Sequence, residues 1–135
     1  MEAIPSPVHS PEEIESTLAA IARESGGGLV VMPDTFLVVN RSQIIKSVTQ
    51  NRTPAIYPYR YFVADGGMLS YGVNTPDIYR RSAEYISRII KGEKPADLPV
   101  QVPVKFELFI NRGAFQALGL TIPQTLLATA DEVIE

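Results

Sequence analysis

The sequence predicts an α/β domain in which helices cover a mostly parallel sheet. Two observations predict this class. Short apolar runs bounded by glycine and proline are typical of strands, and they alternate with segments whose apolar residues recur every three or four positions. The resulting order is roughly β-α-β-α-β-β-α-β-α, which is typical of layered α/β domains. Because 135 residues suffice for one domain with its own core, we expect residues 1–135 to form a single unit.

The composition excludes several classes of function. The net charge is −3 and the chain has no basic run, so nothing favours binding to nucleic acid. The longest apolar runs fall far short of the roughly 20 residues that span a bilayer, which argues against membrane insertion. Cysteine is absent and His9 is the single histidine, so thiol nucleophiles and cysteine or histidine-rich metal sites are excluded. We therefore expect no cofactor and no metal.

The N-terminal quarter holds one well-marked helix. Residues Glu2 to His9 contain two prolines and fit an edge strand or an extended lead-in. Ser10 is the predicted N-cap, Pro11 takes the first helical position, and Glu13 completes a capping box. The buried stripe of this helix is formed by Ile14, Leu18 and Ile21. The glycines at 26–28 precede a strand rather than follow one, so we interpret them as a connection and not as a phosphate-binding loop.

The next strand and helix bring the first candidate site residues. Leu29 to Met32 is a continuous apolar run and predicts a strand buried on both faces. Asp34 and Thr35 follow at its carboxyl end, where ligands bind in sheets of this type, although turn or capping chemistry explains the same residues. Residues Asn40 to Asn51 predict a helix. A capping box of Asn40 and Gln43 would open it, and its inward residues would be Ile44, Ile45 and Val48.

The second half continues with two short strands and a long helix. Strands are predicted at Ala55 to Tyr57 and at Met68 to Tyr71, with a loop from Pro58 to Gly67 between them. The helix begins at the Thr75-Pro76-Asp77 capping signature and runs to Lys91. Its predicted buried side consists of Tyr79, Ala83, Ile86 and Ile90, and Gly92 follows its C-cap.

The C-terminal part predicts one more strand and one more helix. Residues 92–103 form an extended, proline-rich connector. Lys105 to Ile110 alternates as a strand, Asn111 caps a short helix that ends at Gly119, and a final turn begins at Pro123.

The stretch from Pro54 to Arg81 is the richest in residues that suit a ligand site. Five of the six tyrosines lie in it, Tyr79 included, and the candidates for the site are Tyr57, Tyr59, Tyr61 and Tyr71 together with Arg60. Aromatic faces with a polar tip, together with a guanidinium, suit a small planar or anionic molecule. The alternative is that these tyrosines are half-buried packing residues at a sheet edge, and local sequence leaves both readings open.

Several strings together resemble the C-terminal half of one protein family. These strings are PAIYPYRYFV, GGMLSYGVN, YRRSAEYISRIIKGEKPADLPVQVPVKFELFIN and ALGLTIPQTLLATADEVIE. They are similar to the ABC transporter substrate-binding proteins, whose fold is the type I periplasmic binding protein. The resemblance implies a Rossmann-like three-layer lobe, one of two lobes that close on a solute. It also implies a non-catalytic role, delivery of the solute to an ABC permease, and a periplasmic location.

The chain departs from that family at its start. It has no secretory signal and no first lobe, so we expect a truncated second lobe with the segments that cross between lobes, cytoplasmic if the given start is natural. Apolar surface left over on those segments predicts a homodimer. The alternative function is a cytoplasmic ligand sensor or oligomeric scaffold derived from a binding protein.

The resemblance also places the solute. Carried over by position, its contacts are Asp34, Thr35, Tyr57, Tyr59, Arg60, Ser70, Tyr71 and Gly72. Tyr59 would stack on the solute and Arg60 would pair with a carboxylate, which favours an aromatic or carboxylated small molecule. An enzyme, such as a racemase or sugar-phosphate isomerase using Asp34 and Asp65, is disfavoured because neither spacing nor surroundings pair these two acids and cysteine is absent.

Overall fold

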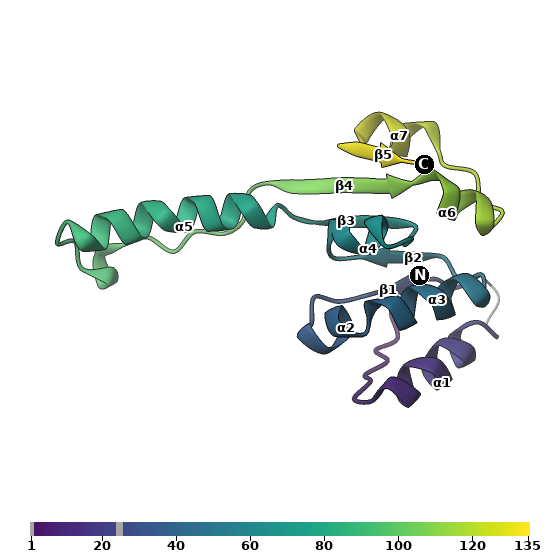
Figure 1. Ribbon diagram of the computed structural model, residues 1–135. Helices are drawn as coiled ribbons and strands as arrows, with labels where there is room; N and C mark the ends of the chain where they lie inside the picture. Colours follow the sequence, from purple (N-terminus) through teal and green to yellow (C-terminus); the bar gives the residue numbers. More distant parts are fainter. Residues whose placement is uncertain (1, 24–25) are drawn as a thin grey trace.

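The computed structural model describes residues 2–23 and 26–135, which form a sheet between helical layers and a projecting arm (Figure 1). The strands are β1 (Leu29–Val30), β2 (Ala55–Tyr57), β3 (Leu69–Val73), β4 (Phe106–Asn111) and β5 (Glu132–Ile134). The helices are α1 (Pro11–Ile21), α2 (Thr35–Val39), α3 (Arg41–Gln50), α4 (Arg60–Ala64), α5 (Thr75–Ile90), α6 (Arg112–Ala117) and α7 (Gln124–Thr129). A single 3-10 turn spans Pro95–Asp97.

The five strands lie in the order β1-β2-β3-β4-β5. The pairs β1/β2, β2/β3 and β4/β5 are parallel, and only β3/β4 is antiparallel. The mostly parallel sheet is therefore confirmed. Paired residues point to the same side of a sheet, so the register puts Tyr57, Ser70, Phe109 and Glu132 on a first face and Ile56, Leu69, Ile110 and Val133 on the second.

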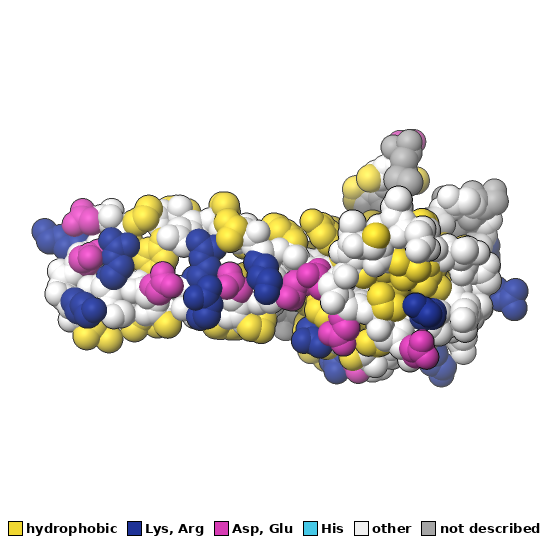
Figure 2. Space-filling view, turned by 90° about the horizontal axis from the view of Figure 1, so that it is seen from above, with side chains coloured by type: hydrophobic (Ala, Val, Ile, Leu, Met, Phe, Trp, Pro, Cys, Tyr) yellow, Lys and Arg dark blue, Asp and Glu magenta, His cyan; other side chains and the backbone are white. Residues whose placement is uncertain are grey.

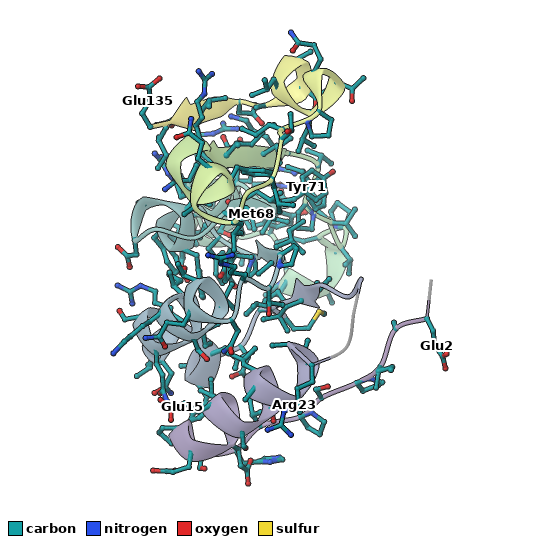
Figure 3. The ribbon with its side chains drawn as sticks, turned by 90° about the vertical axis from the view of Figure 1, so that its right-hand side faces the viewer. Glu2, Glu15, Arg23, Met68, Tyr71 and Glu135 are labelled. Carbon is teal, nitrogen blue, oxygen red and sulfur yellow. The ribbon has the colours of Figure 1, made fainter. Side chains whose placement is uncertain are left out.

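Helices cover the two faces unequally. On the first face, α3 packs over β1 and β2 and α1 packs against α3, and their buried residues join Ala55, Tyr57 and Phe62 in one core. On the second face, the residues of α6 and α7 pack around Met68, Leu108, Ile110 and Phe115 under β3 to β5. Figure 3 shows the sheet from its side, with Glu135 at one end of the stack and Glu15 of α1 at the other. The three-layer prediction is confirmed.

The predicted N-cap of α1 is confirmed. The Ser10 hydroxyl accepts a hydrogen bond from the Glu13 N–H at 3.3 Å. The Glu13 carboxylate in turn accepts from the His9 N–H at 2.7 Å, one residue earlier than a standard capping box. Ile14 and Leu18 are buried as predicted. Residues 2–9 are an extended lead-in without strand pairing.

The predicted first strand is only partly right. Strand β1 has two residues, and Val31 after it is buried, but Val30 and Met32 are 66% and 63% exposed. Burial on both faces is therefore wrong. The reason is that the described helices cover this end of the sheet on the first face alone.

The structure has two short helices that were not predicted. Helix α2 lies between β1 and α3, and α4 occupies half of the predicted Pro58 to Gly67 loop. The predicted capping box at α3 is wrong, because the Asn40 amide donates to the Phe36 carbonyl at 2.9 Å and the Gln43 amide to the Pro11 carbonyl at 2.9 Å. The inward set of α3 is confirmed as buried: Ile44, Ile45 and Val48.

Helix α5 differs most from its prediction. Its N-cap is Asn74 rather than Thr75, because Asn74 Oδ1 accepts from the Asp77 N–H at 2.7 Å. The predicted buried side is wrong, since Tyr79, Ala83, Ile86 and Ile90 are all exposed. Gly92 does follow the C-cap, with a φ of 100°. We call residues 74–105 the arm, because α5 and the connector after it project together from the sheet (Figure 1).

Candidate functional site

A depression of about 310 Å³ opens at the carboxyl ends of β1 and β2. Its lining comes from two segments, one after each strand: Pro33, Asp34, Thr35 and Val38, with Tyr59 and Tyr61. We call it the tyrosine pocket. The site lies there because β1 and β2 are parallel, so the segments that follow them meet at one edge of the sheet.

Asp34 supplies the acidic group of the tyrosine pocket. It is the N-cap of α2, and its Oδ1 accepts a hydrogen bond from the Leu37 N–H at 3.1 Å. This bond fixes the direction of the carboxylate. The other oxygen, Oδ2, has no hydrogen bond to the part of the chain that the structure describes. Asp34 can therefore accept a hydrogen bond from an ammonium, an amide or a hydroxyl of a ligand.

The tyrosines form an aromatic wall that extends into the core. The rings of Tyr59 and Tyr61 stack with centroids 5.2 Å apart, Tyr61 stacks on Phe62 at 5.4 Å, and Phe62 stacks on Tyr57 at 5.1 Å. Burial raises the pKa of the Tyr61 hydroxyl, as does Tyr59 to a smaller extent. Because Tyr57 and Phe62 at one end of this column are buried, its exposed end offers a supported flat surface to an aromatic ligand.

Arg41 is the residue that sequence reasoning missed. Its Nε lies 2.6 Å from Asp65 Oδ2, and its guanidinium lies over the Tyr61 ring, 5.6 Å from the centroid. It also donates to the carbonyl of Val38, which lines the pocket. Arg41 comes from α3, outside the tyrosine-rich stretch, so no local pattern indicated it. Asp65, the acid that the enzyme alternative pairs with Asp34, is held in this ion pair with Arg41 instead.

Tyr57 and Ser70 lie beneath the surface instead of lining the pocket. Both are 1% exposed, and they are neighbours across β2 and β3. Neither hydroxyl has a hydrogen-bond partner among the described residues. Burial raises the pKa of the Tyr57 hydroxyl well above its ordinary value. These two residues support the wall from behind, and a solute in the depression does not touch them.

The remaining predicted site residues are separated from the pocket. The Arg60 guanidinium lies 4.8 Å from the centroid of the Phe109 ring and 3.4 Å from the Glu132 carboxylate. Tyr71 stacks on Phe106 at 5.8 Å, near the base of the arm. A Cβ on Gly72 would lie 2.0 Å from the Pro58 carbonyl oxygen, so this glycine permits a close backbone approach.

Of the eight predicted contacts, three line the tyrosine pocket, namely Asp34, Thr35 and Tyr59. Within residues 2–23 and 26–135, acidic, histidine and cysteine side chains form no cluster that suits a metal ion. Among the same residues, no helix has the length and apolar character to cross a membrane.

The sequence of the whole described domain matches one family. A model of the family described as ABC transporter substrate binding protein matches residues 2–134. The chain belongs to this family. No curated protein matches the chain.

Solved structures of similar proteins share the fold. A conserved domain protein from Vibrio cholerae O1 biovar El Tor is 29% identical with a TM-score of 0.79, covering 91% of this chain and 41% of that one. An ABC domain from Streptococcus pneumonia, solved in complex with L-Trp, is 29% identical with a TM-score of 0.83, covering 94% and 43%. A ligand-free, open substrate binding protein with adhesive properties from Clostridium difficile shares the fold at 20% identity, with a TM-score of 0.65 and coverage of 94% and 42%.

The chain thus spans less than half the length of these family structures. At least 91% of it is covered by two of them, so most of the 32 residues of the arm fall within the shared fold. The arm is therefore part of the fold that the chain shares with these structures.

Proposed function

We propose that this chain is a solute-binding component of an ABC transporter, and that it binds a small aromatic solute in the tyrosine pocket without chemically altering it. The observation that carries the proposal is the pairing of a stacked Tyr59–Tyr61 wall with the Asp34 carboxylate at the carboxyl ends of two parallel strands. Binding clefts in open α/β sheets form at such strand ends. The family match supports the transport role, with an ABC permease as partner and the periplasm as location.

The geometry favours an aromatic solute with a hydrogen-bond donor. A planar ring stacks on Tyr59, and an ammonium or similar donor reaches Asp34 Oδ2. Arg60, predicted from the sequence to pair with a carboxylate of the solute, lies against Glu132 instead. A carboxylate on the solute would be favoured by Arg41, which lies behind Tyr61. The neighbour from Streptococcus pneumonia, solved with L-Trp, supports aromatic amino acids as the first compounds to test.

Three indole compounds separate the contributions of the solute's groups. L-Tryptophan carries an ammonium and a carboxylate, tryptamine keeps only the ammonium, and indole-3-propionate keeps only the carboxylate. We expect L-tryptophan and tryptamine to shift the backbone amide resonances of residues 34–38 and 59–61 in ¹⁵N-labelled protein. Because the depression is open to solvent on one side, we expect dissociation constants of about millimolar, much weaker binding than an enclosed site gives.

A matched pair of variants tests the site. Asn caps helices as well as Asp does, so Asp34→Asn keeps the start of α2 while removing the charge. We expect it to weaken tryptamine binding by about tenfold, the effect of losing one charge-assisted hydrogen bond. Arg60→Ala, on the other side of α4, is the control and should leave the shifts unchanged. Absence of any localised shift with all three compounds at about 10 mM would refute the proposed site.

We also propose that the chain self-associates as a homodimer. The arm exposes many large apolar side chains to solvent, whereas patches on monomeric proteins rarely exceed a few hundred Å². The proposed dimer and the proposed solute site involve different surfaces, so either one is testable without the other.

A further inference from the structure

A cation lies against the wall of the tyrosine pocket. The Arg41 guanidinium lies 5.6 Å from the centroid of the Tyr61 ring and donates to the carbonyl of Val38 at 3.3 Å. Tyr61 and Val38 both line the pocket, on two different segments. These two contacts therefore hold the positive charge of Arg41 close to any solute that the pocket binds.

The lining itself carries the opposite charge. Among the described residues that line the pocket, Asp34 is the one acidic residue and none is basic. With Arg41 unopposed, the pocket would offer one negative and one positive charge, and a carboxylate on the solute would be accepted about as readily as an ammonium. The surroundings of Arg41 therefore decide which charge the pocket prefers.

Asp65 opposes the positive charge of Arg41. Its Oδ2 lies 2.6 Å from Arg41 Nε. Asp65 is the C-cap of α4, the helix that also carries Tyr61, so one helix supplies both part of the wall and the counter-ion. Seen from the pocket, the charges of Arg41 and Asp65 largely cancel, and the charge of Asp34 remains. A solute carboxylate would also have to compete for a guanidinium that already donates to Asp65 and Val38.

Charges of both signs are mixed over the rest of the surface. The net charge of the chain is only −3. Figure 2 shows Lys and Arg side chains interspersed with Asp and Glu side chains along the arm and on the adjoining part of the body. With charges mixed in this way, a local pair beside the pocket affects a bound ligand more than the charge of the whole domain does.

We propose that Asp65 determines the charge specificity of the tyrosine pocket. By neutralising Arg41, it makes the pocket select aromatic solutes that carry an ammonium, namely amines and zwitterionic amino acids, over aromatic acids that carry a carboxylate alone. This inference rests on the proposed solute site and adds the class of solute that the site takes. Asp65 acts through Arg41 and does not touch the solute, so it is a positioning and electrostatic residue.

Two matched variants separate the charge of Asp65 from its structural role. Asp65→Asn removes the charge, while the amide oxygen can still accept the hydrogen bond from Arg41, and Asn is readily accommodated at the end of a helix. Glu132→Gln is the control. It removes the same charge from another exposed ion pair, that of Arg60 on the other side of α4, and changes the net charge of the chain equally.

Titrations of the backbone amide resonances of ¹⁵N-labelled protein, at a constant ionic strength of about 50 mM, give the dissociation constants. The unmodified chain should bind tryptamine more tightly than indole-3-propionate. In Asp65→Asn, tryptamine should bind about two- to threefold more weakly and indole-3-propionate about two- to threefold more tightly, as expected for one charge roughly 10 Å away in a solvated setting. L-Tryptophan carries both charges and should change by less than about twofold. At about 0.5 M salt the differences should disappear, because salt screens charges at this distance.

The direction of the two changes decides the outcome. A loss of strength that is equal for tryptamine and indole-3-propionate in Asp65→Asn would show a structural role and overturn the specificity role, with the solute site intact. An equal change of the ratio in Glu132→Gln would also overturn it, because the net charge and not the Arg41–Asp65 pair would then be responsible. Absence of localised shifts with all three compounds in the unmodified chain would refute the solute site and the role of Asp65 with it.

Discussion

Removal of the Tyr57 hydroxyl is expected to stabilise the domain. This hydroxyl is fully buried behind the tyrosine pocket and has no hydrogen-bond partner among the described residues. A buried polar group without a partner costs about 1–3 kcal/mol of stability. Tyr57→Phe keeps the ring that stacks on Phe62 and deletes only the oxygen. We therefore expect the free energy of unfolding at pH 7 to rise by about 1 kcal/mol, measured by urea denaturation.

The same substitution should change the response to alkaline pH. Burial raises the pKa of Tyr57 in the folded state above the unfolded value of about 10. The folded protein favours the neutral form of this hydroxyl. Ionisation of Tyr57 therefore does not affect the free energy of unfolding below pH 10, and it lowers that free energy as the pH rises further. Above pH 10 the unfolded chain releases this proton and the folded chain retains it, so the free energy of unfolding falls by about 1.4 kcal/mol per pH unit. Between pH 8 and 11.5 the unmodified protein should lose about 2 kcal/mol more than Tyr57→Phe.

The control is Tyr79→Phe, which removes a hydroxyl that is exposed on α5. It should follow the same stability profile as the unmodified protein, since water surrounds this side chain in both states. Urea midpoints at half-unit pH intervals measure all three proteins. If Tyr57→Phe destabilises the domain at pH 7 and loses stability in parallel with the unmodified chain above pH 10, the hydroxyl is hydrogen-bonded and accessible, and the reasoning is refuted.

Two further substitutions test the geometry around the pocket. Gly72→Ala places a Cβ against the Pro58 carbonyl and should lower the free energy of unfolding by about 3 kcal/mol, the upper end for overpacking. Gly27→Ala is the control, because the space around its Cβ is open, and it should change the free energy of unfolding by less than about 1 kcal/mol. Equal effects of the two substitutions would contradict the close approach of Gly72 to Pro58. Arg41→Ala should lower the free energy of unfolding by less than about 1 kcal/mol, because its ion pair with Asp65 is solvent-exposed. The same substitution should weaken L-tryptophan binding several-fold, whereas Arg60→Ala should leave that binding unchanged. A larger loss of binding in Arg60→Ala than in Arg41→Ala would place Arg60 in the site instead.

The sequence predicted what depends on local chemistry. The cap at Ser10, the glycine after α5 and the inward residues of α3 all follow from short-range patterns, and each is confirmed. Strand β5 was not predicted, because Glu132–Ile134 is too short for an alternating pattern and forms only by pairing with β4. The short helices α2 and α4 were missed for a similar reason, since five residues give no period to read.

The sequence indicated where the pocket lies, but not all of the residues that line it. Strand ends identified Asp34, Thr35 and Tyr59, because the segments that follow parallel strands meet at one edge. Neighbours in sequence diverge in space, however. Tyr59 faces the depression, whereas the next residue, Arg60, turns toward Glu132 on β5. The guanidinium that does lie beside the wall comes from Arg41, and only the tertiary contact of α3 with α4 brings it there.

The wrong prediction for α5 shows that an apolar stripe can indicate a covered face without indicating what covers it. An apolar stripe at helical spacing indicates that natural surroundings cover that face, because exposing it to water is unfavourable. The pattern does not say whether the cover is the same sheet, another domain or another chain. Tyr79, Ile86 and Ile90 have the spacing of core residues, yet in one copy they are exposed because the Asn74 junction directs the helix away from the sheet. The stripe on α5 therefore indicates a covered face whose cover is not the sheet of the described domain.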